Sequence, residues 1–496
     1  MAPAVRTGRA WRGDRLARLL TAALALITAA PALAGAELKD TECWFDVGAG
    51  RRTHCAWLTP SRQDAAGAIR LPVVILRRQS ERASRRAVIY LTGGPGAGSD
   101  LDTAGLRAAR MWRAQLGLRQ DLVLYDQRGT GRAQPSLHCD GNDAHLRSVL
   151  AGPGDYGQRM AKAAKFLLAC ARLVSPEDRA AGLYGTVTAA ADLRDLMATL
   201  TRVHGYRSFA LFGESYGTRL AIEAVRGADV PVDRLVLDSV YPPGSGGTLA
   251  ILPEDFEHLL ASIDARCRTL AGCASHEGGI RAALRRALDR LGAAPLQVVA
   301  RDLRAHDRSL EMRIERQDLL DVLVSALYGE DRIAEFPGLL DRLARTGPDP
   351  DWQALFDAAA TLWMDATFSP LAHHLIGCRD NPPLDPAKLD KQLAAWPQFA
   401  DVMRPAPWQY ALCDWMGVPA QPLDTDWEIR IPTLLLSRRI DPATPLHHLE
   451  AVRHRFERAE LIVVPGAGHG VIGVDAEITR RAGRFLDGDP DPIDPQ

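Results

Sequence analysis

The chain has 496 residues, of which 47% are hydrophobic and 24% are charged. This length exceeds what one hydrophobic core usually supports, so we expect either two domains or one large domain with an insertion. The formal net charge of −1 predicts neither nucleic acid nor an acidic membrane surface as a partner.

Residues 1–36 have the pattern of a secretory signal peptide. Arginines from Arg6 to Arg18 precede an apolar segment, Leu19 to Ala30, and small residues follow up to Ala36. The alternative, a membrane anchor, is disfavoured because the apolar segment is short for a bilayer span. The first cysteine, Cys43, does not directly follow the cleavage region, which argues against a lipid anchor. We therefore expect an exported protein, periplasmic or extracellular, without a stable membrane anchor.

The chain contains 8 cysteines, an even number that favours disulfides over free thiols in an exported protein. No Cys-x-x-Cys spacing indicates a metal site, and we expect no metal. Eight cysteines allow about 105 pairings. We expect pairing in chain order because two of the pairs then close short loops. The expected pairs are Cys43–Cys55, Cys139–Cys170, Cys267–Cys273 and Cys378–Cys413.

Short apolar runs predict the strands of an α/β fold. Three runs come early, at Cys43 to Val47, Cys55 to Thr59 and Leu71 to Arg77. Later runs are continuous rather than alternating, as in parallel sheets that are buried on both faces. Segments such as Ala189 to Val203 and Thr218 to Arg226 have the spacing of crossover helices, so the sheet is expected to be doubly wound. The later runs are Ala87 to Leu91, Leu122 to Tyr125, Phe209 to Phe212, Leu235 to Leu237, Thr433 to Leu436 and Leu461 to Val464.

Residues 245–425 are mainly helical in pattern, with one hairpin expected around Leu296 to Glu315. An insertion between two late strands lies at the carboxyl edge of the sheet, where it would form a lid. We therefore expect a hydrolase-like core over 37–244 and 426–486, and a helical cap over 245–425. Residues 487–496 are polar and rich in proline, which predicts a disordered tail.

The stretch Gly213-Glu214-Ser215-Tyr216-Gly217 lies between an apolar run and a helix-like run. A strand that turns sharply into a helix through Gly-x-Ser-x-Gly holds the serine hydroxyl at an exposed apex. The glycines are needed because larger side chains would collide in so tight a turn. Ser215 is therefore the expected nucleophile.

A serine nucleophile needs an imidazole base and a carboxylate that orients the imidazole. In this topology the acid follows a late strand and the histidine follows the last one. Asp441 and His469 occupy these positions, and the glycines beside His469 let the backbone place its ring freely. Asp238 also ends a strand and is an alternative acid. Three further histidines are expected on an exposed helix face: His447, His448 and His454.

The oxyanion that forms during attack needs N–H donors. One is expected from the backbone of Tyr216, directly after the serine. The other is expected from Gly93 or Gly94, in the glycine-rich loop Thr92 to Gly98 that follows a strand. A phosphate-binding loop is the alternative interpretation, but the lysine and hydroxyl residues of a P-loop are missing.

Five motifs follow one another along the chain: Thr92-Gly-Gly-Pro-Gly96, Asp126-Gln-Arg-Gly-Thr-Gly131, Gly213-Glu-Ser-Tyr-Gly217, Asp441-Pro-Ala-Thr-Pro445 and Gly468-His469. In this order they resemble those of the secreted tripeptidyl aminopeptidases and their relatives, the prolyl iminopeptidases. Cys378-Arg-Asp380 and Cys413-Asp-Trp415 are also similar to that group. The resemblance implies an α/β-hydrolase fold with a helical cap, no cofactor, and cleavage of residues from free peptide N-termini. Thr92 stands where prolyl iminopeptidases usually carry histidine, which favours the tripeptidyl branch.

Other residues near these motifs have open roles. Glu214 either shapes the turn or helps to bind the charged amine of a substrate. The Asp126 to Gly131 segment is interpreted as a structural loop beside the site. The resemblance implies that acidic cap residues bind the substrate amine, but four candidates remain unassigned: Glu330, Asp331, Glu335 and Asp365.

The sequence therefore predicts an exported serine aminopeptidase that acts through an acyl-enzyme. A carboxylesterase or amidase for small compounds is the first alternative, because the triad does not separate esters from amides. A non-catalytic binding protein on a hydrolase scaffold is the second alternative.

Overall fold

The computed structural model describes residues 35–48, 52–67, 69–78, 85–246, 252–274, 278–303, 308–329 and 332–490. The expected signal peptide lies outside these residues except for its last two positions. The end of the expected tail, 491–496, and the candidates Glu330 and Asp331 also lie outside them. None of the described helices has both the length and the apolar character needed to cross a membrane.

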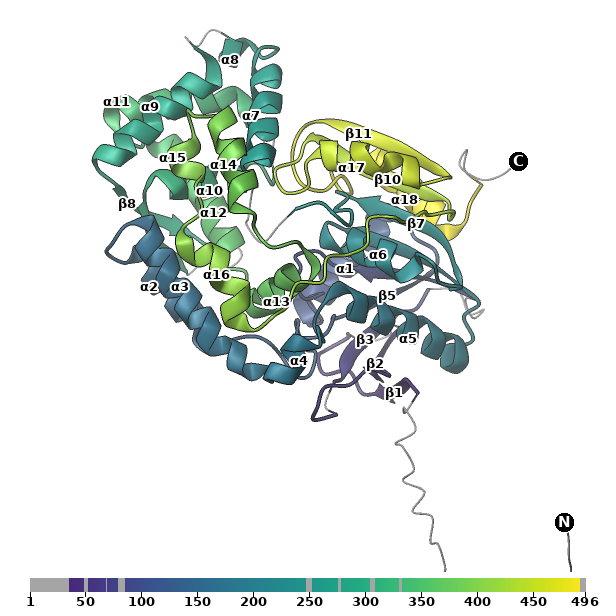
Figure 1. The fold of residues 1–496 in the computed structure, drawn as a ribbon. Coiled ribbons are helices and arrows are strands. Elements are labelled where there is room, and N and C mark those ends of the chain that lie inside the picture. The colour runs from purple at the N-terminus through teal and green to yellow at the C-terminus, as the bar shows by residue number, and fades with distance from the viewer. Residues whose placement is uncertain are drawn as a thin grey trace, which may run out of the picture. The chain divides into compact units, whose positions relative to one another are not determined.

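Nine strands of the described chain form one sheet in the order β1-β2-β3-β5-β4-β6-β7-β10-β11 (Figure 1). The first three strands and the contact of β3 with β5 are antiparallel, and the remaining contacts are parallel. The predicted α/β fold with a mostly parallel sheet is confirmed. The strands are β1 (Glu37–Thr41), β2 (Thr53–Thr59), β3 (Leu71–Leu76), β4 (Arg86–Leu91), β5 (Asp121–Tyr125), β6 (Ser208–Glu214), β7 (Val232–Asp238), β10 (Thr433–Ile440) and β11 (Ala459–Ala467).

Helices cover both faces of this sheet, which explains the continuous apolar runs. Ile89 and Leu211 pack in a buried cluster with α5 and α6. Their neighbours Val88 and Phe212 pack in another cluster with α1 and α18. Alternate side chains of a strand point to opposite faces, so both sets must be apolar. The helices of this part are α1 (Thr103–Leu116), α4 (Pro176–Ala180), α5 (Thr186–His204), α6 (Tyr216–Val225), α17 (Leu446–Val452) and α18 (Ala476–Asp487).

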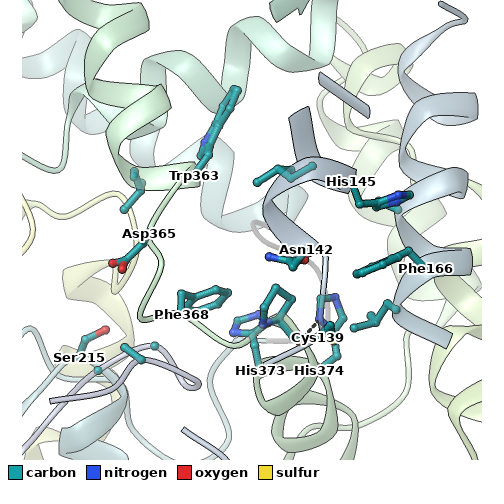
Figure 2. A pocket seen from close by; sticks show the side chains of 18 of the residues that line it. Cys139, Asn142, His145, Phe166, Ser215, Trp363, Asp365, Phe368, His373 and His374 are labelled. Atoms are coloured by element: carbon teal, nitrogen blue, oxygen red, sulfur yellow. Dashed lines mark hydrogen bonds between the residues drawn. The ribbon is translucent and has the colours of Figure 1, made fainter. Parts of the chain in front are cut away.

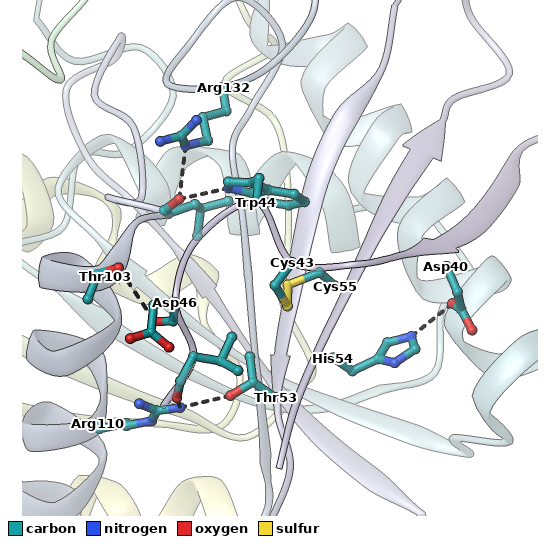
Figure 3. The surroundings of a disulfide bond; sticks show 12 residues. Asp40, Cys43, Trp44, Asp46, Thr53, His54, Cys55, Thr103, Arg110 and Arg132 are labelled. Atoms are coloured by element: carbon teal, nitrogen blue, oxygen red, sulfur yellow. Dashed lines mark hydrogen bonds and ion pairs between the residues drawn. A yellow bond between two sulfur atoms is a disulfide. The ribbon is translucent and has the colours of Figure 1, made fainter. Parts of the chain in front are cut away.

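The segment Cys43 to Val47 is irregular rather than a strand, and β1 forms earlier in the chain. Figure 3 shows this segment beside the amino-terminal part of α1. The Trp44 indole N–H donates to the carbonyl of Leu101 over 2.9 Å, and Arg110 donates to the carbonyl of Val47 over 3.2 Å. Contacts with α1 and with the loop before α1 therefore replace the strand-to-strand hydrogen bonds that the apolar pattern predicted.

The cap is mainly helical, as expected, and contains the expected hairpin, β8 with β9. Its helices bury an apolar core of their own around Trp352, Leu288 and Phe336. The elements are α7 (Pro253–Cys267), α8 (Ala271–Ala274), α9 (Gly279–Ala293), β8 (Leu296–Arg301), β9 (Ser309–Ile314), α10 (Arg316–Ala326), α11 (Phe336–Thr346), α12 (Gln353–Trp363), α13 (Pro370–Asp380), α14 (Pro386–Ala395), α15 (Ala400–Met403) and α16 (Pro407–Met416). The described chain also has 3-10 helices at Ala171–Leu173, Ile333–Glu335, Pro350–Trp352 and Arg453–Arg455.

The packing does not follow the boundaries expected for core and cap. A second insertion, α2 (Asn142–Ala151) and α3 (Tyr156–Cys170), joins the cap, with α2 against β9 and a buried ion pair between Arg159 and Asp318. Conversely, α13 and α16 pack through Leu375 and Leu412 in a cluster of the sheet. The strands before both insertions, β5 and β7, are part of the parallel set, so the insertions emerge at the same carboxyl edge and meet there.

Four disulfides join the eight cysteines in chain order. Cys139–Cys170 closes the insertion of α2 and α3, and Cys378–Cys413 joins α13 to α16. The other two are Cys43–Cys55, drawn in Figure 3, and Cys267–Cys273 in the cap.

The expected tail begins within regular structure. Asp487 ends α18, and its carboxylate accepts the backbone N–H of Arg119 over 3.0 Å. Burial raises the pKa of Asp487, although the bonds from Arg119 oppose that shift. This contact with the loop after α1 fixes Asp487, the first residue of the segment 487–496 whose composition predicted disorder.

Candidate active site

Ser215 lies at the turn between β6 and α6, with φ 54° and ψ −121°. A Cβ on Gly217 would lie 2.0 Å from the Leu91 carbonyl oxygen, and one on Gly213 would lie 2.6 Å from the Gly217 carbonyl oxygen. Real Cβ atoms do not approach backbone oxygens this closely, so both positions require glycine. The turn holds the serine in a strained conformation of the kind that persists at functional sites.

His469 and Asp441 form a hydrogen-bonded pair at the ends of β11 and β10. The Nδ1 atom of His469 lies 2.9 Å from Oδ1 of Asp441 and 3.0 Å from Oδ2. The carboxylate also accepts the Ala443 and Thr444 N–H groups over 2.9 and 2.8 Å. Since Nδ1 faces a carboxylate, it carries the proton, which leaves Nε2 as an acceptor. His469 and Ser215 line the same cavity.

The charges of this pair stabilise one another. Burial by itself lowers the pKa of His469, but the charge and hydrogen bond of Asp441 outweigh burial and raise it. Burial likewise favours the neutral form of Asp441, but His469 and the backbone N–H groups lower the pKa of this carboxyl overall. Asp441 is therefore ionised at neutral pH and stabilises the imidazolium that forms when His469 accepts a proton.

Asp238, the alternative acid, makes different contacts. Its carboxylate accepts the N–H groups of Val471 and Ile472, each over 2.9 Å, and its backbone carbonyl accepts the Ser215 N–H over 2.9 Å. Burial, reinforced by the charge of Glu214, raises the pKa of Asp238 to about 7. Asp238 thus joins the nucleophile turn to the loop that carries His469, while the imidazole bonds to Asp441.

The expected oxyanion loop lies against the nucleophile. A Cβ on Gly93 would lie 3.0 Å from the Cβ of Ser215, and Gly94 has φ 106°. The cap holds this loop from the other side, because the Ser369 N–H donates to the carbonyl of Gly96 over 2.8 Å. Tyr216 is the first residue of α6, so its N–H is one of the unpaired donors at a helix start. These positions suit an oxyanion hole.

The Asp126 to Gly131 loop is hydrogen-bonded to the oxyanion loop, Thr92 to Gly98, and to the residue that follows it. The Asp126 carboxylate accepts the N–H groups of Ser99 and Arg132, each over 2.7 Å. The Gln127 amide donates to the Thr92 carbonyl over 3.2 Å. Burial raises the pKa of Asp126 to about 6, while the two N–H donors oppose that shift. The side chains of Asp126 and Gln127 thus bond to backbone groups, which suits the structural role expected for this loop.

Ser215 lines two cavities. The apolar cavity has a volume of about 720 Å³ and extends from Ser215 towards His145 and Phe166 (Figure 2). It is lined mainly by apolar groups from α2, α3, α13, α16 and the segment after α12. The polar cavity has a volume of about 440 Å³, and its lining includes Tyr156, Asp321, Ser325 and Thr444. Cap and core both line each cavity.

Glu214 lies beside the nucleophile and lines the apolar cavity. Its carboxylate accepts the Tyr90 hydroxyl over 2.8 Å. Of the unassigned cap acids, Asp365 also lines the apolar cavity, and Glu335 forms an exposed ion pair with Arg332.

Sequence reasoning missed two residues of this site. Tyr328, just after α10, accepts the His469 N–H at its carbonyl over 3.0 Å, which ties the cap to the loop of the base. Asp321 of α10 lines the polar cavity and accepts the Tyr156 hydroxyl over 3.2 Å. The one signal in the sequence was an acid within the apolar run Leu319 to Val324.

His447 and His448 do not lie on an exposed helix face. Their Nε2 atoms lie 3.2 and 2.7 Å from Oδ1 of Asp255 in α7, and both side chains are half-buried. His454 is exposed, as expected. Two clusters of the described residues bring imidazoles and a carboxylate close enough to hold a metal ion: Asp255 with His447 and His448, and Asp40 with His54 and His204.

Comparisons with known proteins found similar sequences and folds. The family profile described as alpha/beta hydrolase fold matches residues 86–309, and the profile described as TAP-like protein matches residues 403–488. The chain is 26% identical to the tripeptidyl aminopeptidase of Streptomyces lividans over 94% of this chain and 86% of that protein. The Streptomyces coelicolor tripeptidyl aminopeptidase is 26% identical over 94% and 85% of the two chains. A solved proline iminopeptidase of Mycobacterium smegmatis is 15% identical, covers 86% of this chain and 97% of that chain, and has a TM-score of 0.36. The chain therefore has an α/β-hydrolase fold and is similar, over most of its length, to the tripeptidyl aminopeptidases.

Proposed function

We propose that this protein is a serine aminopeptidase that cleaves short peptides or single residues from free peptide N-termini. The observation that carries the proposal is that Ser215 lines two cavities and that His469, which is paired with Asp441, lines one of them as well. A peptide bond at Ser215 would have space on both sides. The similarity to the two Streptomyces tripeptidyl aminopeptidases supports this substrate class.

In this mechanism the Ser215 Oγ attacks the carbonyl carbon of the scissile bond while Nε2 of His469 accepts the hydroxyl proton. The oxyanion receives the N–H of Tyr216 and that of Gly94 or Gly93. The imidazolium, stabilised by Asp441, then gives its proton to the leaving amine, and the acyl group stays on Ser215. Water deprotonated by His469 attacks this ester and releases the acyl product.

The polar cavity suits the charged N-terminus of the substrate. Asp321 lies there, deep in the protein but with accessible surface, and no arginine, lysine or histidine of the described chain forms an ion pair with it. Burial, reinforced by the charge of Asp318, raises the pKa of Asp321 to about 7. The charge of Arg159 opposes this shift only in part, and an ammonium group would add a second positive charge and lower this pKa. The apolar cavity would then receive the leaving peptide. Glu214 is the second candidate for the amine, although it already binds Tyr90.

A substrate panel tests the proposal. We expect hydrolysis of peptides with a free N-terminus and loss of hydrolysis after N-acetylation. The Asp321→Asn variant should raise KM for free peptides by about 10-fold or more, because a hydrogen bond to a charged group is worth roughly 1.5–3 kcal/mol. The matched control is Asp365→Asn, which removes a carboxylate from the apolar cavity and should leave the preference unchanged.

Two outcomes would reject this function. Turnover of acetylated esters without turnover of free peptides would identify an esterase. No labelling of the wild-type protein by a fluorophosphonate probe, with Ser215→Ala as the blank, would identify a binding protein. The four disulfides also support the proposed export, because such bonds persist in oxidising compartments. Sequencing the N-terminus of the mature protein tests that part.

A further inference from the structure

Two histidines and an aspartate converge on one point between the cap and the helix that follows the Asp441 loop. Asp255 belongs to the first turn of α7, and His447 and His448 belong to the first turn of α17. Both Nε2 atoms approach the same oxygen, Oδ1 of Asp255, and the three ligand atoms lie within 4.8 Å of one another. We infer that Asp255, His447 and His448 form a binding site for a divalent transition-metal ion of the Zn²⁺ type.

The residue types and distances fit such an ion. Zn²⁺ takes imidazole nitrogens and carboxylate oxygens at about 2.0–2.2 Å in tetrahedral sites, so its ligand atoms lie roughly 3.3–3.5 Å apart. The Asp255–His447 distance, 3.2 Å, is already close to this spacing. The Asp255–His448 distance of 2.7 Å must open by about half an ångström. This movement is small for a half-buried side chain.

The surroundings hold the ligands and leave an entry path. The His258 ring stacks on the His447 ring with centroids 4.0 Å apart, which limits rotation of that imidazole. Asp255 and His448 both line the polar cavity, so an ion can enter from there and keep water in its fourth position. Within the described residues, Asp255 forms no ion pair with an arginine or lysine that would repel a cation.

The second cluster of the described chain shows what disfavours a metal. Asp40, His54 and His204 also lie close together, but the Arg77 guanidinium lies 3.1 Å from Nδ1 of His204. His204 Nε2 is 4.0 Å from the Asp40 carboxylate. A divalent cation at Nε2 of His204 would be repelled by the positively charged Arg77 guanidinium, which lies at the other nitrogen of the same imidazole ring. His54 therefore provides a matched control within the same chain.

Equilibrium dialysis of the full, EDTA-treated protein against Zn²⁺ tests the inference. We expect about one bound Zn²⁺ per chain, and a loss of affinity greater than about 100-fold in His447→Ala/His448→Ala, since losing even an outer partner of a metal ligand costs roughly 10- to 100-fold. His54→Ala and Ser215→Ala should bind as wild type does. Binding by Ser215→Ala separates this result from any test of peptidase activity.

Two further measurements keep the test decisive. The unfolding midpoint of the wild-type protein should rise with Zn²⁺ concentration, because an ion that binds only the folded state stabilises it. Asp255→Asn, which keeps the side-chain volume, should remove this rise even if the double variant does not fold. A Co²⁺ complex should show the intense visible bands of four-coordinate cobalt. Equal Zn²⁺ binding by wild type and the ligand variants, or no binding by wild type, would overturn the inference.

Discussion

The ends of β7 and β10 lie side by side in the sheet, and each carries a buried aspartate next to the loop of His469. Asp441 bonds to the imidazole, and its pKa is lowered because His469 and backbone donors outweigh the effect of burial. Asp238 bonds to the backbone of Val471 and Ile472, and burial with the nearby charge of Glu214 raises its pKa to about 7. The two aspartates share residue type and burial, and their hydrogen-bond partners decide which acid orients the base and which holds the loop of the base.

The largest expected effect comes from Asp441→Asn. An amide at this place donates a hydrogen to Nδ1 of His469 and favours the wrong tautomer, so kcat should fall by about 10,000-fold. Steady-state hydrolysis of a chromogenic peptide with a free N-terminus measures this, with Ser215→Ala as the floor. Retention of a tenth of the wild-type rate would mean that another group orients the imidazole.

Asp238→Asn should have a much smaller effect on kcat, on the order of 10-fold, because the His469 imidazole keeps its own partner. Asp238→Ala instead leaves two buried N–H groups unpaired and should lower the free energy of unfolding by about 1–3 kcal/mol or more. Urea unfolding beside kinetics separates the two effects. If Asp238→Asn reduced kcat as strongly as Asp441→Asn, the division of roles drawn here would be wrong.

The charge of Glu214 should act on His469, and the pH dependence of kcat/KM measures this effect. Activity requires neutral His469, whose pKa is raised above 6.5 because Asp441 outweighs the lowering effect of burial and Glu214 adds to the shift. Activity should therefore fall as the pH drops through a value above 6.5. Glu214→Gln removes one negative charge and should move this limb to lower pH by a fraction of a unit, whereas Tyr90→Phe keeps the charge. If the acid limb of the kcat/KM profile stayed in place in Glu214→Gln, the charge of Glu214 would not act on His469.

A last prediction concerns how the stability of the fold depends on pH. Burial and Glu214 raise the pKa of Asp238 from 3.8 to about 7, so the folded state holds this proton more tightly than the unfolded state. The resulting stabilisation is present below pH 4 and is lost as the pH rises towards 7. Asp238→Asn should abolish this dependence, and its free energy of unfolding relative to wild type should improve between pH 4.5 and 7.5. Denaturation at these two pH values measures the change, and a constant difference would argue against the raised pKa.

The sequence alone was sufficient for the features that depend on neighbours along the chain. Apolar runs that alternate with helical patterns predicted the parallel sheet, because strands buried on both faces leave that local pattern. Gly213 and Gly217 marked the nucleophile turn. A side chain at Gly217 would collide with the backbone of Leu91, and one at Gly213 would collide with the backbone of Gly217. Chain order after the late strands then selected Asp441 and His469 as candidates for the acid and the base.

Only the tertiary structure decided which distant groups meet. The separate partners of Asp238 and Asp441, the packing of α2 against β9, the polar cavity around Asp321 and the contact of Asp255 with His448 all join residues far apart in sequence. Each of these side chains looks ordinary in its local segment. Its role follows from the field and the hydrogen bonds that another part of the chain supplies, and local propensity carries no information about them.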